Sequence, residues 1–112
     1  MRIGKQMKVY LIREKNNINA TAEFDPNTKA VTVCKGSTLS VSITRTGKFR
    51  GAKSIDERRK GVMKDNILQK DVTFKSASSA ANFVTGSSTN GLITWKDKDG
   101  RTIKEILSKA EV

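Results

Sequence analysis

Three short apolar segments near the N-terminus constrain the fold more than any other feature of the sequence. Residues Met7–Arg13 are mostly apolar or β-branched, Ile18–Phe24 alternates apolar with polar side chains, and residues 30–35 repeat that alternation. A period of two is typical of a strand with one buried face. The separating residues 16–17 (Asn-Asn) and 25–27 (Asp-Pro-Asn) are turn sequences. The short spacing therefore predicts an antiparallel β-meander.

The middle of the chain predicts shorter elements. Residues 39–44 alternate over a shorter length and indicate a fourth strand. Ser54 can cap a helix over residues 55–63, because the two acidic residues of its first turn favour the helix dipole. Residues 72–74 indicate one more short strand.

Beyond this strand, capping and turn residues predict a helix and a hairpin. Ser76 or Ser78 can begin a helix that Gly86 ends. Residues 90–91 (Asn-Gly) are a hairpin-turn signal, and residues 92–95 then read as a short strand.

The chain is expected to form one α+β domain. Residues 97–100 (Asp-Lys-Asp-Gly) predict another turn, and Thr102 can cap a last helix. A length of 112 residues suits a single domain over residues 1–112. We therefore expect a small antiparallel β-meander with two or three short helices packed on one face, and its most recognisable motifs fall within residues 72–103.

The sequence is strongly basic, with 22 Lys and Arg residues against 11 Asp and Glu residues. Such a chain attracts polyanions, of which nucleic acid is the commonest and an anionic membrane surface the next. A solvated surface without a ligand is the alternative explanation. Residues 45–60 carry seven basic and two acidic residues, an excess of +5, against +2 over residues 61–112. The candidates for nucleic-acid binding in this segment are Arg45, Lys48, Arg50, Lys53, Arg58, Arg59 and Lys60.

A second group of candidates surrounds the predicted hairpin. Ser87, Ser88 and Asn90 lie between a helix and a strand, where hydroxyl and backbone N–H groups can contact one phosphate. The geometry of the connection explains these residues equally well. The basic members of this group are Lys75, Lys96, Lys98 and Arg101.

Residue types that support catalysis or metal binding are sparse. The sequence has no histidine, which is the usual general base and the commonest zinc ligand. Cys34 is the only cysteine and is expected to be a small buried residue of the third strand. Asp97 and Asp99 lie in a glycine-containing turn, where aspartates bond the local backbone. We therefore expect no enzymatic activity, no cofactor and no metal site.

The aromatic residues and the hydropathy pattern complete these expectations. Trp95, the only tryptophan, could stack on a base, but a lone tryptophan in a small domain is more often core. Phe74 and Phe83 are expected in the core for the same reason. No stretch approaches the roughly 18 apolar residues of a membrane helix, and no signal peptide begins the chain. We therefore expect a soluble cytoplasmic protein.

The order of motifs over residues 72–103 resembles a known family. Phe74 is followed by a serine-rich cap, paired alanines and Gly86, then by Asn-Gly at residues 90–91, Trp95 and Asp-Gly at residues 99–100. This run resembles an uncharacterised domain that is appended to GIY-YIG endonucleases and restriction-modification proteins. It is also similar to the RAMA (restriction enzyme adenine methylase associated) domain, which has been proposed to read modified DNA. The proline usual in the serine-rich cap is replaced here by Ala-Ser at residues 77–78.

Charge and resemblance together predict a non-catalytic nucleic-acid-binding module, with DNA as the expected ligand. The resemblance implies that it acts beside a separate nuclease or methyltransferase, because no such domain precedes it in this sequence. The alternative is a protein-interaction adaptor for an acidic partner, with residues 90–95 as a docking edge. Membrane-surface binding is disfavoured, because no basic helix has a matching bulky apolar face.

Overall fold

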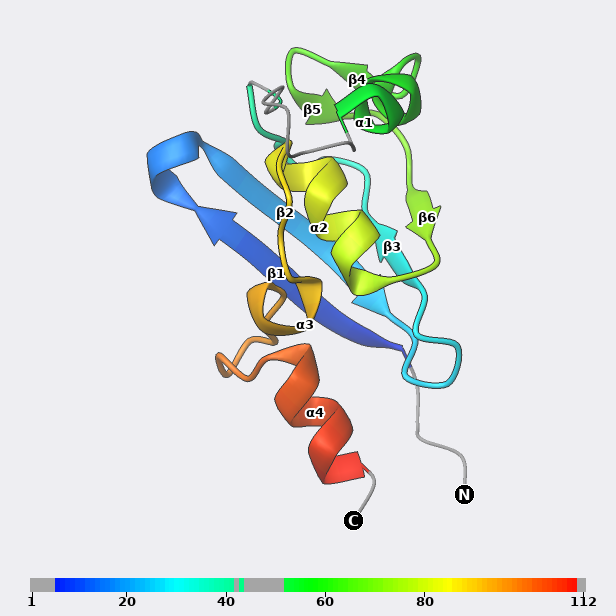
Figure 1. Cartoon of the computed structure of the whole chain (residues 1–112). Coiled ribbons are helices and arrows are strands. Elements are labelled where there is room, and N and C mark those ends of the chain that lie inside the picture. The colour runs from blue at the N-terminus through cyan, green and yellow to red at the C-terminus, as the bar shows by residue number, and fades with distance from the viewer. Residues whose placement is uncertain (1–5, 42, 44–51, 111–112) are drawn as a thin grey trace.

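The computed structural model describes residues 6–41, 43 and 52–110 (Figure 1). Strands β1 (Met7–Arg13) and β2 (Ile18–Phe24) are joined by the 3₁₀ turn η1 (Glu14–Asn16), and β3 (Val31–Val33) follows. With β6 (Val72–Phe74), they form one antiparallel sheet in the order β1-β2-β3-β6. The predicted meander is therefore confirmed, although its third strand is shorter than residues 30–35.

One face of the sheet carries the core. The register pairs Val9 with Ala22 and Ala22 with Val33, so side chains from three strands align on this face. Helix α2 (Ala77–Thr85) packs across it (Figure 1). Ala20 and Ala22 are fully buried, and their short side chains let the helix approach β2 closely. Each valine or leucine buried here contributes about 1.5–3 kcal/mol.

The capping residues of two helices were predicted correctly. At the start of α2, the Ser76 Oγ accepts a hydrogen bond from the Ser79 N–H (3.1 Å). At its end, Gly86 adopts φ 73°, a left-handed conformation that costs glycine little. Helix α4 (Ile103–Ala110) begins after Thr102, whose Oγ1 accepts from the Glu105 N–H (3.2 Å). The α+β class is confirmed, with four α-helices within the described residues.

Helix α1 (Ala52–Arg59) begins and ends earlier than the predicted residues 55–63. Ser54 therefore lies inside the helix and is not its cap. The chain continues into a small hairpin of β4 (Met63–Lys64) and β5 (Ile67–Leu68), which was not predicted. Both residues of its turn, Asp65 and Asn66, have positive φ (53° and 67°), as a two-residue hairpin turn of type I′ requires.

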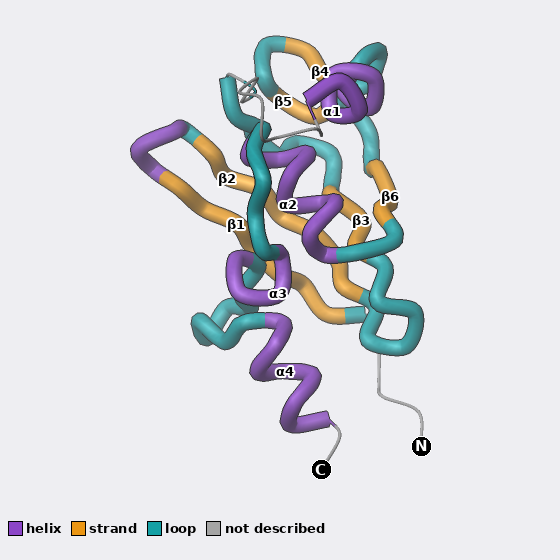
Figure 2. The backbone as a smooth tube through the Cα atoms, viewed as in Figure 1, coloured by secondary structure: helices purple, strands orange, loops and turns teal. Residues whose placement is uncertain are grey.

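The predicted hairpin turn at residues 90–91 and strand at residues 92–95 are wrong. Residues Gly91–Thr94 form the short helix α3 (Figure 2), and the Asn90 side chain caps it by accepting from the Leu92 N–H (3.1 Å). The reason is tertiary packing. A Cβ atom on Gly91 would lie 2.1 Å from the backbone carbonyl of Ala77, so this contact requires glycine.

The predicted fourth strand is also absent from residues 39–41 and 43, while residues 42 and 44 lie outside the described residues. The Leu39 N–H donates to the Asn66 carbonyl (2.8 Å), and the Ser40 N–H donates to the Val84 carbonyl (2.9 Å). The backbone of this segment therefore joins the β4–β5 hairpin to the end of α2 instead of extending the sheet.

Candidate nucleic-acid interface

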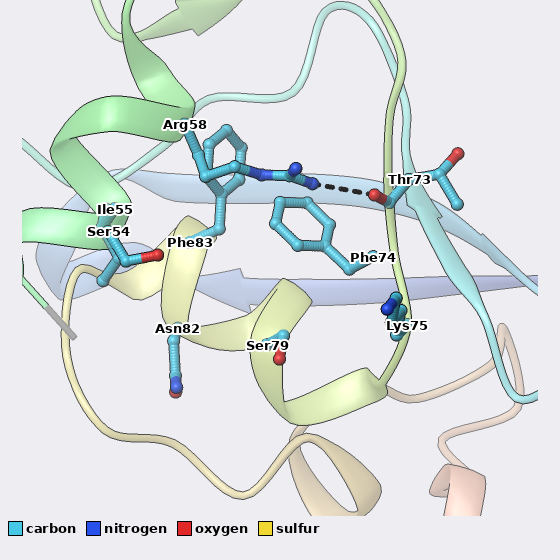
Figure 3. A pocket seen from close by; sticks show the side chains of 9 residues that line it. All are labelled: Ser54, Ile55, Arg58, Thr73, Phe74, Lys75, Ser79, Asn82 and Phe83. Atoms are coloured by element: carbon cyan, nitrogen blue, oxygen red, sulfur yellow. Dashed lines mark hydrogen bonds between the residues drawn. The ribbon is translucent and has the colours of Figure 1, made fainter.

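A groove of about 380 Å³ lies between α1, β6 and α2 (Figure 3). Arg58 reaches it from α1, and Lys75 reaches it from the residue after β6. These are two of the predicted binding residues, 17 positions apart in the sequence. The described residues that line it include no aspartate or glutamate; they are Ser54, Ile55, Arg58, Thr73, Phe74, Lys75, Ser79, Asn82 and Phe83.

The guanidinium of Arg58 is held in place at this groove. Its carbon lies 4.5 Å from the centroid of the Phe74 ring, and its Nη2 donates to the Thr73 carbonyl (2.8 Å). Thr73 belongs to an edge strand of the sheet, so this bond pairs a backbone group that would otherwise face solvent. Arg58 remains exposed, and one hydrogen bond to Thr73 leaves most of its five N–H donors available.

Neutral polar groups line the same groove. Ser79 and Asn82 are three residues apart on α2 and therefore lie on one face of the helix. The Asn82 Oδ1 accepts from the Thr89 N–H (2.8 Å), which fixes the amide and leaves its NH₂ group as a donor. The Ser79 Oγ accepts from the Ser76 hydroxyl (3.0 Å), so the Ser79 hydroxyl proton is also available.

The sequence of residues 11–107 matches a family described as "Domain of unknown function (DUF4357)". The chain belongs to this family. The match includes every residue that lines the groove, so the groove is part of the DUF4357 domain. No curated protein and no solved structure matches the chain.

Arg59 of the DUF4357 domain is not part of the basic surface, contrary to the prediction. Its exposed fraction is 6%. The guanidinium donates to the carbonyl oxygens of Phe83 (2.8 and 3.2 Å) and Ser40 (3.0 Å), and more weakly to that of Val84 (3.4 Å). Burial lowers the pKa of Arg59, and nearby Asp56 partly offsets that effect. Arg59 therefore binds the C-terminal end of α2, where a positive charge favours the helix dipole.

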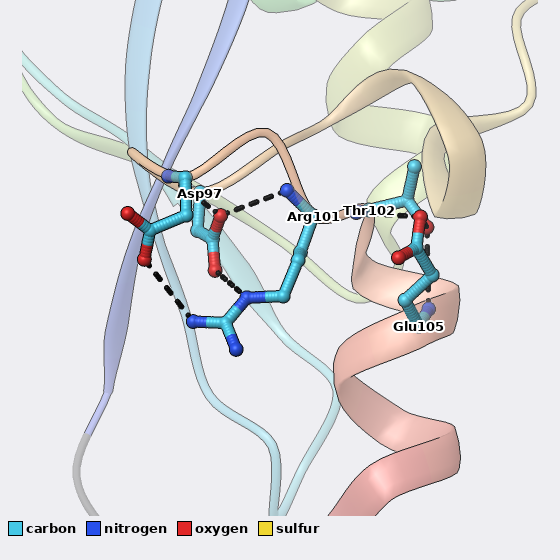
Figure 4. A network of polar contacts seen from close by, with 5 residues as sticks. Asp97, Arg101, Thr102 and Glu105 are labelled. Carbon is cyan, nitrogen blue, oxygen red and sulfur yellow. Dashed lines mark hydrogen bonds and ion pairs between the residues drawn. The ribbon is translucent and has the colours of Figure 1, made fainter.

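Among the basic residues after α3, Arg101 is partly neutralised by the carboxylates of its own turn (Figure 4). The Arg101 guanidinium pairs with Asp97 (3.1 Å) and Asp99 (3.2 Å), and the Asp97 Oδ1 also accepts backbone N–H groups of this turn. The predicted bonding to the local backbone is therefore confirmed for Asp97, whereas the Asp99 carboxylate bonds the Arg101 side chain. Lys96 pairs with Tyr10 at the β1 edge, the opposite edge of the sheet from β6 and Lys75. The structure thus separates Lys96, Lys98 and Arg101 from the groove.

The remaining predicted residues occupy different positions. The backbone N–H of Ser87 is bonded to the Thr85 hydroxyl (3.3 Å), so it is not free to cradle a phosphate, and Asn90 caps α3. Ser88 is exposed, as are Lys53 on α1 and Lys60 after it. Arg45, Lys48 and Arg50 lie outside the described residues.

The aromatic residues are core residues, as predicted. Trp95 is fully buried, and its Nε1–H donates to the Ala77 carbonyl (3.0 Å). Phe74 and Phe83 are buried with ring centroids 4.9 Å apart and form the base of the groove. Cys34 is half-buried, not fully buried as expected, because alternation along the chain places it with half-buried Thr32 on the face of the sheet opposite the core residues Val31 and Val33. Burial raises the pKa of its thiol.

Two further findings concern the described residues as a whole. None of their His, Cys, Asp and Glu side chains gather into a group of three that could hold a metal ion. None of their helices has both the length and the apolar composition needed to cross a bilayer.

Proposed function

We propose that this DUF4357 domain is a non-catalytic nucleic-acid-binding module, with DNA as the expected ligand and the groove as its contact surface. The observation that supports this is the lining of the groove, in which the described residues include two cations and no carboxylate. Phosphate contacts from Lys and Arg supply most sequence-independent affinity for nucleic acid, because they release condensed counterions. A net charge of +11 adds long-range attraction.

The sequence resemblance adds a proposal about context. Domains of this pattern are appended to GIY-YIG endonucleases and restriction-modification proteins, and the RAMA domain accompanies adenine methylases. We therefore propose that the domain serves a separate DNA-processing enzyme in the cytoplasm and performs no chemistry itself.

A protein-interaction adaptor is the second candidate function. Its predicted docking edge at residues 90–95 does not exist as a strand, because residues 91–94 are helical. Instead, α3 exposes two consecutive apolar side chains, Leu92 and Ile93. Their exposed fractions are 40% and 51%. Scattered apolar side chains are common on protein surfaces, so this candidate ranks second.

A salt titration tests the proposal. Fluorescence anisotropy with labelled DNA should show that the logarithm of the association constant K falls linearly with the logarithm of the salt concentration. Lys75→Gln should reduce the magnitude of that slope by about 0.7 on single-stranded DNA or about 0.9 on a duplex, the values for one lost phosphate contact. Lys104→Gln removes the same charge from exposed α4, away from the groove, and is the matched control. Absence of salt-dependent binding, or equal losses in both variants, would refute the proposal.

A further inference from the structure

We infer that the groove holds one unpaired nucleotide, with its phosphate on Arg58 and Lys75 and its base edge on Ser79 and Asn82. This inference rests on the proposed function and specifies its ligand as single-stranded nucleic acid. Three observations support it: the size of the groove, the ordered side chain of Arg58, and the hydrogen-bond donors of Ser79 and Asn82.

Size limits what can enter. Sites for small ligands measure about 300–1,000 Å³, and the groove, at about 380 Å³, is near the lower limit. A double helix can touch only the rim of such a groove. A single nucleotide with its base turned away from a partner strand can enter it, as single-stranded bases do in many nucleic-acid-binding domains.

Arg58 supplies a fixed cation at one side of the groove. Stacking on Phe74 and the bond to Thr73 order the side chain before any ligand arrives. Less conformational entropy is then lost on binding than for a free surface arginine. Lys75 adds a second cation from the adjacent chain segment, and Figure 3 shows both side chains around the Phe74 ring.

Ser79 and Asn82 supply neutral donors, which can bond either phosphate oxygens or the acceptors of a base edge, and we assign them to the base because Arg58 and Lys75 are present for the phosphate. Because the Thr89 N–H already occupies the Asn82 oxygen, the amide presents its NH₂ group and therefore selects an acceptor. Base edges carry such acceptors at ring nitrogens and carbonyl oxygens. The shared chemistry admits DNA and RNA, so both must be tested.

Four probes separate the alternatives: a short single-stranded DNA, its duplex, an RNA of equal sequence, and an abasic phosphodiester of equal length. The single strands, DNA or RNA, should bind about tenfold more tightly than the abasic chain, since a hydrogen-bonded base contributes about this much. They should also bind more tightly than the duplex at equal salt.

Two variants test the residues. Asn82→Asp keeps the oxygen that accepts from Thr89 but places a carboxylate in the groove, so it should abolish the preference for single strands over the abasic chain. Ser79→Ala should weaken that preference several-fold, and it is a second route if Asn82→Asp fails to fold by thermal melting. Ser108→Ala, at an exposed position of α4 outside the groove, is the control and should bind like wild type.

The outcomes distinguish this inference from the proposed function. If no probe binds, the proposed function fails. If all four probes bind equally, or if both variants keep the full preference for single strands, the domain still binds nucleic acid but the nucleotide site is wrong.

Discussion

Replacing Arg59 with methionine should destabilise the protein without directly changing its ligand-binding surface. The side chain is buried, and its guanidinium joins α1 to the end of α2 and to Ser40. Methionine preserves much of the apolar stem but removes all five hydrogen bonds found for this guanidinium among the described residues. The Phe83 carbonyl oxygen then loses both of its bonds to Arg59.

The size of the effect follows from three contributions. A buried carbonyl left without a donor costs about 1–3 kcal/mol. Loss of a cation from a partly buried helix C-terminus costs up to about 2 kcal/mol. Methionine avoids the desolvation cost of a buried charge, which offsets part of this loss. The expected decrease in the free energy of unfolding is about 2–4 kcal/mol, a large share of the roughly 5–15 kcal/mol typical of a domain.

Urea denaturation followed by circular dichroism measures this difference. With a slope of about 1–3 kcal/mol per molar urea, the midpoint should fall by about 0.7–4 M. Arg59→Lys keeps the charge but not the planar donors and should give an intermediate value. Lys60→Met, at the exposed neighbouring position, is the control. A stability of Arg59→Met within about 0.5 kcal/mol of wild type, as for ordinary surface changes, would show that these bonds do not support the fold.

Three further predictions concern other parts of the fold. Trp95→Ala should lower the free energy of unfolding by about 3–5 kcal/mol, and a well-folded variant with lost DNA affinity would instead identify a stacking residue. Gly91→Ala should lower the free energy of unfolding by about 3 kcal/mol or more, because the new Cβ overlaps the Ala77 backbone. Thermal melting measures this loss, and an unchanged melting temperature would contradict the contact. Partial burial raises the pKa of Asp97, but hydrogen bonds from the backbone N–H groups of Arg101 and Asp99 and the Arg101 guanidinium outweigh it, so the net pKa is lowered. Ionised Asp97 therefore stabilises the folded protein above the unfolded pKa of about 3.9, and this contribution should be lost as pH falls through the lower folded pKa. An NMR titration that gives the Asp97 carboxyl a pKa at or above about 3.9 would contradict this prediction.

Local signals were sufficient where one segment determines its own structure. The bounds of β2 follow from alternation over seven residues, because a shift by one residue would expose every core side chain, and the bounds of β1 follow from its apolar and β-branched run. The caps Ser76 and Gly86 likewise act on neighbouring backbone groups and need no distant partner. These features were therefore predictable from the sequence.

The errors occur where a distant contact decides between two local possibilities. Asn-Gly at residues 90–91 suits a hairpin turn or a helix start, and the fit of Gly91 against Ala77 favours the helix. The two strands at Met63–Lys64 and Ile67–Leu68 are too short for any periodic pattern. Only the positive-φ pair between them, Asp-Asn, could have indicated the hairpin.

Two adjacent residues that were predicted to bind nucleic acid also differ in where the structure places them. Arg58 and Arg59 are chemically identical, yet one faces the groove and the other the interior, because successive helix residues point about 100° apart. One signal in the sequence could have separated them. Arg59 lies four residues after Ile55, so a helix that buries Ile55 also turns Arg59 inward.

The recognisable motif of residues 72–103 is used mainly to build the fold. Ser76 and Asn90 cap helices, Gly91 allows a close approach, and Trp95 fills the core. A substitution at any of these structural residues would change the stability of the fold as well as any contact with a ligand. Lys75 lies in the same motif, but its side chain makes no hydrogen bond to the described residues and is exposed at the groove. The ligand should therefore be sought through variants such as Lys75→Gln, whose binding and stability can be separated, and not through the residues by which the family is recognised.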